Sequence, residues 1–196
     1  MKSSVGQKTI ISMFNNCLIE GRTIDAFNTD VEITSKDDLK IINSNLLAYC
    51  DKVDSHASIT VTTPTVLTLA IGSTIGSDGG DGASSGKTQV NIYCKQLVNI
   101  DKQYGVITLN QHGSILIDNV NPDGDALFDH EDINNLGPGM FKLYEGGWSG
   151  KIVLRGLNNM FAIRYIKAIG LIENKGGYAL SYTYNDKYLT ICADNA

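Results

Sequence analysis

Apolar residues in the first quarter of the chain recur at the spacing of an α-helix. Between Lys8 and Glu20, Ile10, Phe14, Cys17 and Leu18 fall on one helical face. A second helix is predicted to begin after Ser35, since Ser35 and Asp38 have the spacing of a capping box. Apolar residues then recur at steps of three and four, as in an a/d seam of about two heptads: Leu39, Ile42, Leu46, Tyr49 and Val53. The pattern predicts an α-helical module over residues 1–57.

This seam has two interpretations. The helix can pack on the chain's own β-domain, as apolar stripes on globular helices commonly do. Alternatively, the five seam residues are oligomerisation contacts that gather several copies of the chain into a short bundle. The second interpretation predicts a homo-oligomer, with a trimer as the expected state.

Beyond Ser58 the pattern changes to the two-residue period of β-strands. Apolar and polar residues alternate from Gln89 to Cys94 and again near the C-terminus, and residues 66–71 are apolar on both faces. Gly, Asn and Asp separate these runs, and no repeat of fixed period is evident. Short strands with such turns are typical of an antiparallel sandwich or jelly roll. We predict a mainly β protein, with a β-sandwich domain over residues 58–196.

Three segments of this domain carry more specific predictions. Asn110–Gly113 and Asn185–Asp186 have the residues of hairpin turns. Phe161–Ile172 fits either a strand or a helix. Gly82–Thr88 resembles a phosphate-binding P-loop, but Asp81 stands where the motif needs its first glycine. A strand pattern follows where the motif needs a helix, so we expect residues 76–86 to form a loop without nucleotide.

Composition narrows the possible partners. The chain has 196 residues and a formal net charge of -5, with no run of Lys or Arg. This balance argues against a nucleic acid or an anionic membrane as the partner. The N-terminus lacks a secretory signal and no run is long enough for a membrane span, which predicts synthesis in a cytoplasm. The four cysteines have no C-x-x-C spacing, so no zinc site is indicated.

An acidic segment is the main candidate for a metal site. Oxygen ligands at alternate positions could form a short calcium loop between strands, with these ligands: Asn121, Asp123, Asp125 and Asp129. An EF-hand is excluded because His130 stands where that motif needs a glutamate. The alternative is an ordinary Asn-Pro-Asp-Gly turn, which binds nothing and which we favour. A hydrolase acting through Asp118–Asp132 ranks lowest, because no nucleophile motif supports it. We expect no enzyme and no cofactor.

Aromatic residues near the C-terminus are the candidate binding surface. Trp148 lies between two small residues in a predicted turn, and Tyr178, Tyr182 and Tyr184 share one face of a predicted strand. Exposed rings of this kind stack on sugars or anchor interfaces. The alternative is that the tyrosines line the core with their hydroxyls at its edge.

The order of the predicted parts, a helical seam followed by a glycine-punctuated β-domain, resembles the small fibre, tail and decoration proteins of bacteriophage particles. The resemblance is one of organisation and carries over no functional residue. It implies a virion structural protein that attaches to other virion proteins through its N-terminal module. Its β-domain would then stabilise a capsid or bind a host-surface glycan. The alternative function is a monomeric carbohydrate-binding module.

Overall fold

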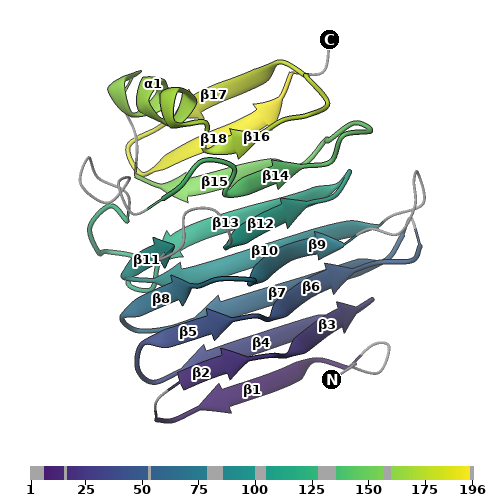
Figure 1. The fold of residues 1–196 in the computed structure, drawn as a ribbon, viewed down its shortest axis with the longest axis vertical. Coiled ribbons are helices and arrows are strands. Elements are labelled where there is room, and N and C mark those ends of the chain that lie inside the picture. The colour runs from purple at the N-terminus through teal and green to yellow at the C-terminus, as the bar shows by residue number, and fades with distance from the viewer. Residues whose placement is uncertain are drawn as a thin grey trace.

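The computed structural model describes residues 7–15, 17–52, 54–78, 86–99, 105–127, 136–156 and 160–194. The chain forms an elongated stack of strands, with the N-terminal strands at one end and the C-terminal strands at the other (Figure 1). The strands belong to three sheets, which we name by their strand number.

The eight-stranded sheet runs in the order β1 (Thr9–Met13), β4 (Asp30–Ser35), β7 (His56–Thr62), β10 (Lys87–Cys94), β13 (Gly113–Asn119), β15 (Lys151–Arg155), β18 (Tyr188–Ala193) and β17 (Leu180–Tyr184). The four-stranded sheet consists of β11 (Gln96–Asn99), β8 (Val66–Leu69), β5 (Leu39–Ile42) and β2 (Cys17–Glu20). The six-stranded sheet consists of β16 (Ile172–Glu173), β14 (Phe141–Leu143), β12 (Val106–Leu109), β9 (Thr74–Asp78), β6 (Asn45–Tyr49) and β3 (Thr23–Phe27).

Successive strands enter the three sheets in a fixed order, so the chain winds as a coil. The first coil is β1, β2 and β3, the second is β4, β5 and β6, and the next two continue in the same way. Each coil pairs in parallel with the coil before it. This arrangement is a parallel β-helix.

Alternate side chains of each strand point into the coil and stack on their counterparts in the next coil. On the eight-stranded sheet one such stack runs through Ile11, Ile33, Val61, Ile92, Ile117, Leu154 and Leu189. On the six-stranded sheet another runs through Ile24, Leu46, Ile75, Ile107, Phe141 and Ile172. These stacks form one hydrophobic core that extends along the molecule.

The two ends of the coil differ. At the N-terminal end, β1, β2 and β3 are edge strands, and the core-facing Ile11 and Met13 are only partly buried. At the C-terminal end, helix α1 (Met160–Ile169) joins β15 to β16, in the position that a strand of the four-stranded sheet takes in earlier coils. Strands β17 and β18 pair antiparallel and cover that end beside α1 (Figure 1).

The predicted antiparallel sandwich or jelly roll is wrong, because the sheets are mostly parallel. The predicted helical N-terminal module is also wrong: residues 7–15, 17–52 and 54–57 contain no helix. Apolar residues seemed helical because two strands of period two meet at a corner. In the second coil the predicted seam combined the inward-facing Leu39 and Leu46 with the outward-facing Ile42 and Tyr49. Residues on opposite faces of β5 and β6 therefore imitated one helical stripe.

Local predictions had mixed outcomes. Asn110–Gly113 is not a hairpin but a corner between β12 and β13, which lie in different sheets. Asn185 does begin a hairpin, confirmed by its N–H bonding to the carbonyl of Tyr188 at 3.0 Å. Phe161–Ile172 is mostly helix. Much of the predicted loop over residues 76–86 lies outside the described residues, although Gly76 belongs to β9.

Candidate functional site

The outer face of the six-stranded sheet carries an open groove of about 750 Å³. Four strands build its floor, because outward-facing residues of neighbouring coils lie side by side. Asn45 is adjacent to Thr74, and Leu47, Gly76, Thr108 and Lys142 form a row across β6, β9, β12 and β14. Tyr144 and Glu145, just after β14, also line the groove. The groove therefore presents hydroxyl and amide groups beside the side chains of Leu47 and Tyr144.

Charges at the C-terminal end of the groove are paired. Lys142 Nζ lies 3.9 Å from Glu173 Oε2, and Lys175 Nζ lies 3.1 Å from Glu173 and 3.6 Å from Glu145. The hydrogen bond and charge of Glu173, with the charge of Glu145, raise the pKa of Lys175. Two cations and two carboxylates thus leave this end of the groove close to neutral.

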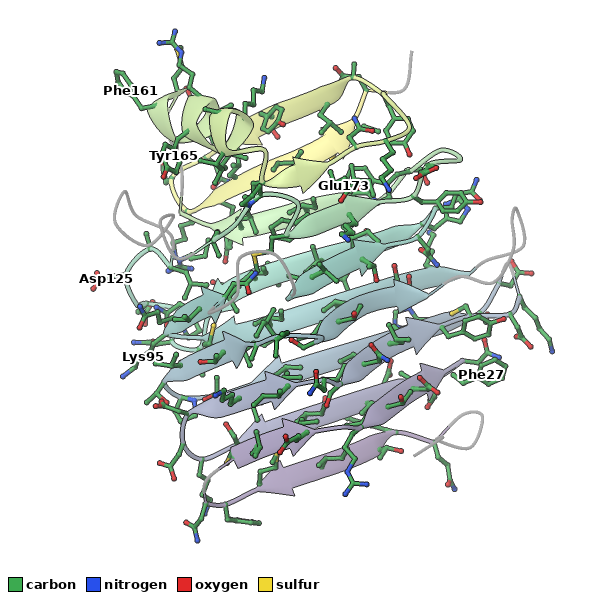
Figure 2. All side chains as sticks on the ribbon, in the orientation of Figure 1. Phe27, Lys95, Asp125, Phe161, Tyr165 and Glu173 are labelled. Atoms are coloured by element: carbon green, nitrogen blue, oxygen red, sulfur yellow. The ribbon has the colours of Figure 1, made fainter. Side chains whose placement is uncertain are left out.

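Aromatic rings lie on the same outer face. Tyr144 is 37% exposed beside the groove. Phe27 and Tyr49 are paired neighbours on β3 and β6, and their rings stack with centroids 5.2 Å apart and planes at 15°. Figure 2 labels Phe27 at the end of β3, near the N-terminal end of the stack.

A second hollow, of about 460 Å³, lies on the eight-stranded sheet, where strands β7, β10, β13 and β15 begin. Its lining includes His56, Lys87, Gln89, His112, Ser114 and Lys151. We call this hollow the basic cleft. Ser149 also lines it, with Oγ 2.7 Å from His112 Nδ1 and 3.1 Å from the carbonyl oxygen of Gln111.

The aromatic residues predicted to bind do not form one surface. Trp148 is 2% exposed, and its indole N–H donates to the carbonyl of Gly113 at 2.8 Å. Tyr178 and Tyr182 pack partly against the core, and burial raises the pKa of Tyr182. Lys167 lies over the Tyr182 ring at 4.4 Å, which leaves Tyr184, 51% exposed, as the most open of the four.

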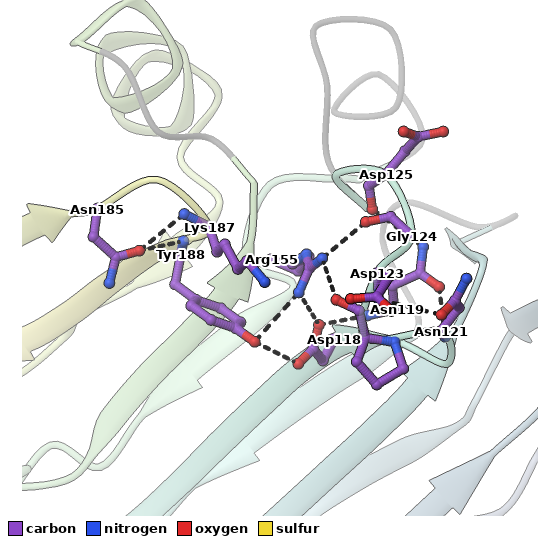
Figure 3. Close-up of polar contacts among 11 residues, drawn as sticks. Asp118, Asn119, Asn121, Asp123, Gly124, Asp125, Arg155, Asn185, Lys187 and Tyr188 are labelled. Atoms are coloured by element: carbon purple, nitrogen blue, oxygen red, sulfur yellow. Dashed lines mark hydrogen bonds and ion pairs between the residues drawn. The ribbon is translucent and has the colours of Figure 1, made fainter.

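The candidate calcium loop is organised around an arginine. The Arg155 guanidinium donates to the carbonyls of Pro122 and Gly124 at 2.9 and 2.8 Å (Figure 3). The side chain of Asn121 accepts from the N–H of Asp123, as in an Asx turn, and Asp125 projects away from the other carboxylates (Figure 3).

A fixed positive charge therefore lies against two backbone carbonyls of the oxygen-rich loop. Asp129 lies outside the described residues. No group of three or more His, Cys, Asp or Glu residues within the described ranges could hold a metal ion. The geometry is that of the Asn-Pro-Asp-Gly turn that we favour over a calcium site: the N–H of Gly124 donates to the carbonyl of Asn121 at 2.9 Å.

Arg155 also joins two elements beneath this loop. Its Nη1 lies 3.4 Å from Asp118 Oδ1, and the Tyr188 hydroxyl donates to Asp118 Oδ2 at 2.8 Å. The side chains of Arg155 and Asp118 are only 6% and 13% exposed. Burial and the charge of Asp118 raise the pKa of neighbouring Tyr93. This buried cluster fastens the turn and the C-terminal hairpin to β13 and β15.

The residues predicted to mediate oligomerisation do not form a helical seam. Leu39 and Leu46 are fully buried in the coil interior, and Ile42 and Tyr49 are half-buried. Val53 lies outside the described residues. The supposed capping residue Asp38 instead accepts hydrogen bonds from Thr65 and from the N–H of Val66 in the next coil, and these bonds lower its pKa.

Sequence reasoning did not predict the residues of either hollow. The groove residues are outward-facing positions between core residues, and a coil register is needed to align them. One signal could have provided that register: Cys17–Ala26, Leu39–Ala48 and Leu67–Ser77 each place inward apolar residues on both sides of a Gly or Asn corner. Gly21, Asn43 and Gly72 mark those corners with positive φ.

No protein-family model, curated protein or solved structure matches this chain. No helix in the described part of the chain is long and apolar enough to cross a membrane. Function is therefore inferred from the geometry of the groove and the basic cleft.

Proposed function

We propose that the protein is a non-enzymatic binding protein that holds an extended, neutral glycan in the groove of the six-stranded sheet. The observation that carries this proposal is the groove floor itself, in which outward-facing uncharged residues of successive coils lie side by side. Asn45 and Thr74 form one such pair, and Thr108 continues the adjacent row.

The spacing of the floor suits a polymer that crosses the strands. Neighbouring strands are about 4.8 Å apart, which is close to the length of one hexose unit in an extended glycan. Amide and hydroxyl groups can both donate to and accept from sugar hydroxyls. Tyr144 offers an aromatic face to the apolar side of a sugar ring, and Leu47 adds an apolar floor. Each coil can therefore contact one unit of the chain.

The lining favours binding over cleavage. Glycoside hydrolysis generally uses two carboxyl groups on opposite sides of the scissile bond. Among the described residues that line the groove, Glu145 is the single carboxylate, and it is paired with Lys175 at 3.6 Å. The other functional groups of the floor are suited to recognition.

A virion role remains a prediction, and one structural feature supports it. The N-terminal end exposes edge strands together with Ile10, Phe14 and Leu18, which are 64%, 59% and 44% exposed. Such an end could attach to another virion protein while the groove stays accessible on the side of the coil. Oligomer formation also remains a prediction, without the helical seam that first suggested it.

Binding can be measured with a glycan array followed by calorimetry on neutral linear oligosaccharides. We expect Tyr144→Ala and Thr108→Val each to weaken binding about fivefold to tenfold, since each removes about 1 kcal/mol of contact. Calorimetry is preferred to tryptophan fluorescence because Trp148 is buried away from solvent.

Matched controls lie on the C-terminal hairpin. Tyr184→Ala and Thr183→Val remove the same groups from exposed positions of β17. The proposal requires them to bind like the unmodified protein. It fails if no neutral glycan binds, or if the control variants lose as much affinity as the groove variants.

A further inference from the structure

The basic cleft gathers cationic side chains on a protein whose net charge is -5. His56 and Lys87 are paired neighbours on β7 and β10. Lys151 begins β15, and β13 separates it from β10. Strand spacing separates Lys87 and Lys151 by about 10 Å across the sheet, and Lys87 lies two residues earlier in the register. Both lysines line the cleft, from strands on either side of β13.

These two lysines are not neutralised by neighbouring carboxylates. Neither forms an ion pair with another residue in the described part of the chain. The acid that contacts the cleft residue His56 is already engaged: Asp30 lies 3.5 Å from His56 Nε2 and accepts from the Ser58 hydroxyl at 2.6 Å. The described lining of the cleft thus has two lysines and no carboxylate, and an anionic ligand can neutralise this positive charge.

Ser149 positions His112 toward a ligand. A serine hydroxyl has one proton, and its donation to the Gln111 carbonyl leaves Oγ to accept from Nδ1–H of His112. This assignment of protons satisfies both contacts. It also means that His112 does not act as a base toward Ser149. The imidazole is held by Nδ1, and Nε2 has no bond to another described residue.

We infer that the basic cleft is a second binding site, selective for a sugar unit that carries a carboxylate or sulfate group. The anionic group lies over β13 between Lys87 and Lys151, within reach of His112. A bare anion would leave most of the 460 Å³ volume unfilled. Ser114 and Gln89, on the cleft floor, supply the hydroxyl and amide groups that sugar hydroxyls need.

A nucleic acid is the less suitable anion. Phosphate backbones are normally bound by many cations along an extended surface. The described lining of the cleft has two lysines and two histidines, and the protein as a whole would repel a polyanion. An acidic sugar needs one local charge match and several neutral hydrogen bonds.

Calorimetry at low salt tests the inference with four probes of equal length: glucose, glucuronic acid and sulfated glucose oligosaccharides, and oligothymidylate. We expect one or both acidic oligosaccharides to bind at least about tenfold more tightly than the glucose oligomer. The K87Q/K151Q variant should lose that preference, because it removes both of the cations that would form charge-assisted hydrogen bonds to the anionic group. The comparison between the two acidic probes tells carboxylate from sulfate.

The matched control is K40Q/K95Q, which removes the same charge elsewhere. Lys40 is on the four-stranded sheet, and Lys95 follows the opposite end of β10 from Lys87. This control should retain the preference within about twofold, since distant surface charges are screened. S149A should weaken binding of the acidic probe by loosening His112.

Three results would overturn the inference. Neither acidic probe binds more tightly than the neutral one, both double variants lose the acidic preference equally, or oligothymidylate binds as tightly as the acidic sugars. The groove proposal is judged separately. Thr108→Val affects neutral glycan in the groove and should leave the acidic preference of the cleft unchanged, so each site can fail alone.

Discussion

Arg155 shows how a single buried charge can organise a surface turn. Its guanidinium contacts Asp118 on β13, two carbonyls of the turn, and the ring and hydroxyl of Tyr188 on the hairpin. Asp118 was part of the acidic segment that suggested a hydrolase or a calcium loop. The carboxylate is instead paired and hydrogen-bonded, which is how proteins accommodate a buried charge. Its role in the structure is to hold elements together.

Removing this guanidinium should destabilise the fold strongly. Arg155→Met leaves Asp118 buried without its counter-charge and leaves the Pro122 and Gly124 carbonyls without their donor. We expect a loss of about 3–5 kcal/mol in the free energy of unfolding, measured with urea. Arg164→Met, on the exposed face of α1, is the control and should change stability by less than about 0.5 kcal/mol. Equal effects of both substitutions would show that the buried cluster contributes little.

The turns between strands, more than the strands themselves, distinguish this β-helix from the predicted antiparallel sandwich. The alternating strands beyond residue 58 were recognisable because period two is a local property. Which strands pair is not local. Asn110–Gly113 has the composition of a hairpin turn, yet it directs the chain into another sheet, where β13 pairs with β10 from the previous coil. Turn residues indicate that the chain bends, and packing of whole coils decides where it goes.

Two glycine corners between the four-stranded and six-stranded sheets provide a test at this scale. Gly21 and Gly72 have φ of 61° and 69°, a region that costs other residues about 1–2 kcal/mol. A Cβ at Gly21 meets nothing within 4 Å, whereas a Cβ at Gly72 would collide with the side chain of Asn43 in the preceding coil. We expect Gly21→Ala to cost about 1 kcal/mol and Gly72→Ala more than that, because the Asn43 side chain must also shift, measured by urea unfolding. Equal costs would mean that corner stacking does not constrain neighbouring coils.

At the scale of the whole molecule, the sequence supported a mainly β chain but not its architecture or its site. The coil length varies, since Leu39 follows Cys17 by 22 residues and Leu67 follows Leu39 by 28. A search for a fixed period therefore misses the repeat. The groove and the basic cleft require the same register, because Thr108 becomes a neighbour of Lys142, and Lys87 of His56, only after the coils stack.

A stacked coil should also have a gradient of local stability along its axis. Each coil contacts only its neighbours, so the end coils have fewer stabilising interfaces than the central ones. The N-terminal coil is the weaker end, because Ile11 and Met13 are only partly buried, whereas α1 and the hairpin of β17 and β18 cover the C-terminal end. Hydrogen exchange measured by mass spectrometry should show β1, β2 and β3 exchanging fastest among the strands and β7, β10 and β13 slowest.

Deleting residues 1–28 should then make β4, β5 and β6 the fastest, while the C-terminal strands keep their protection. Uniform exchange along the chain, or loss of protection in β15 and β18 after the deletion, would show that the coils fold as one unit without this gradient.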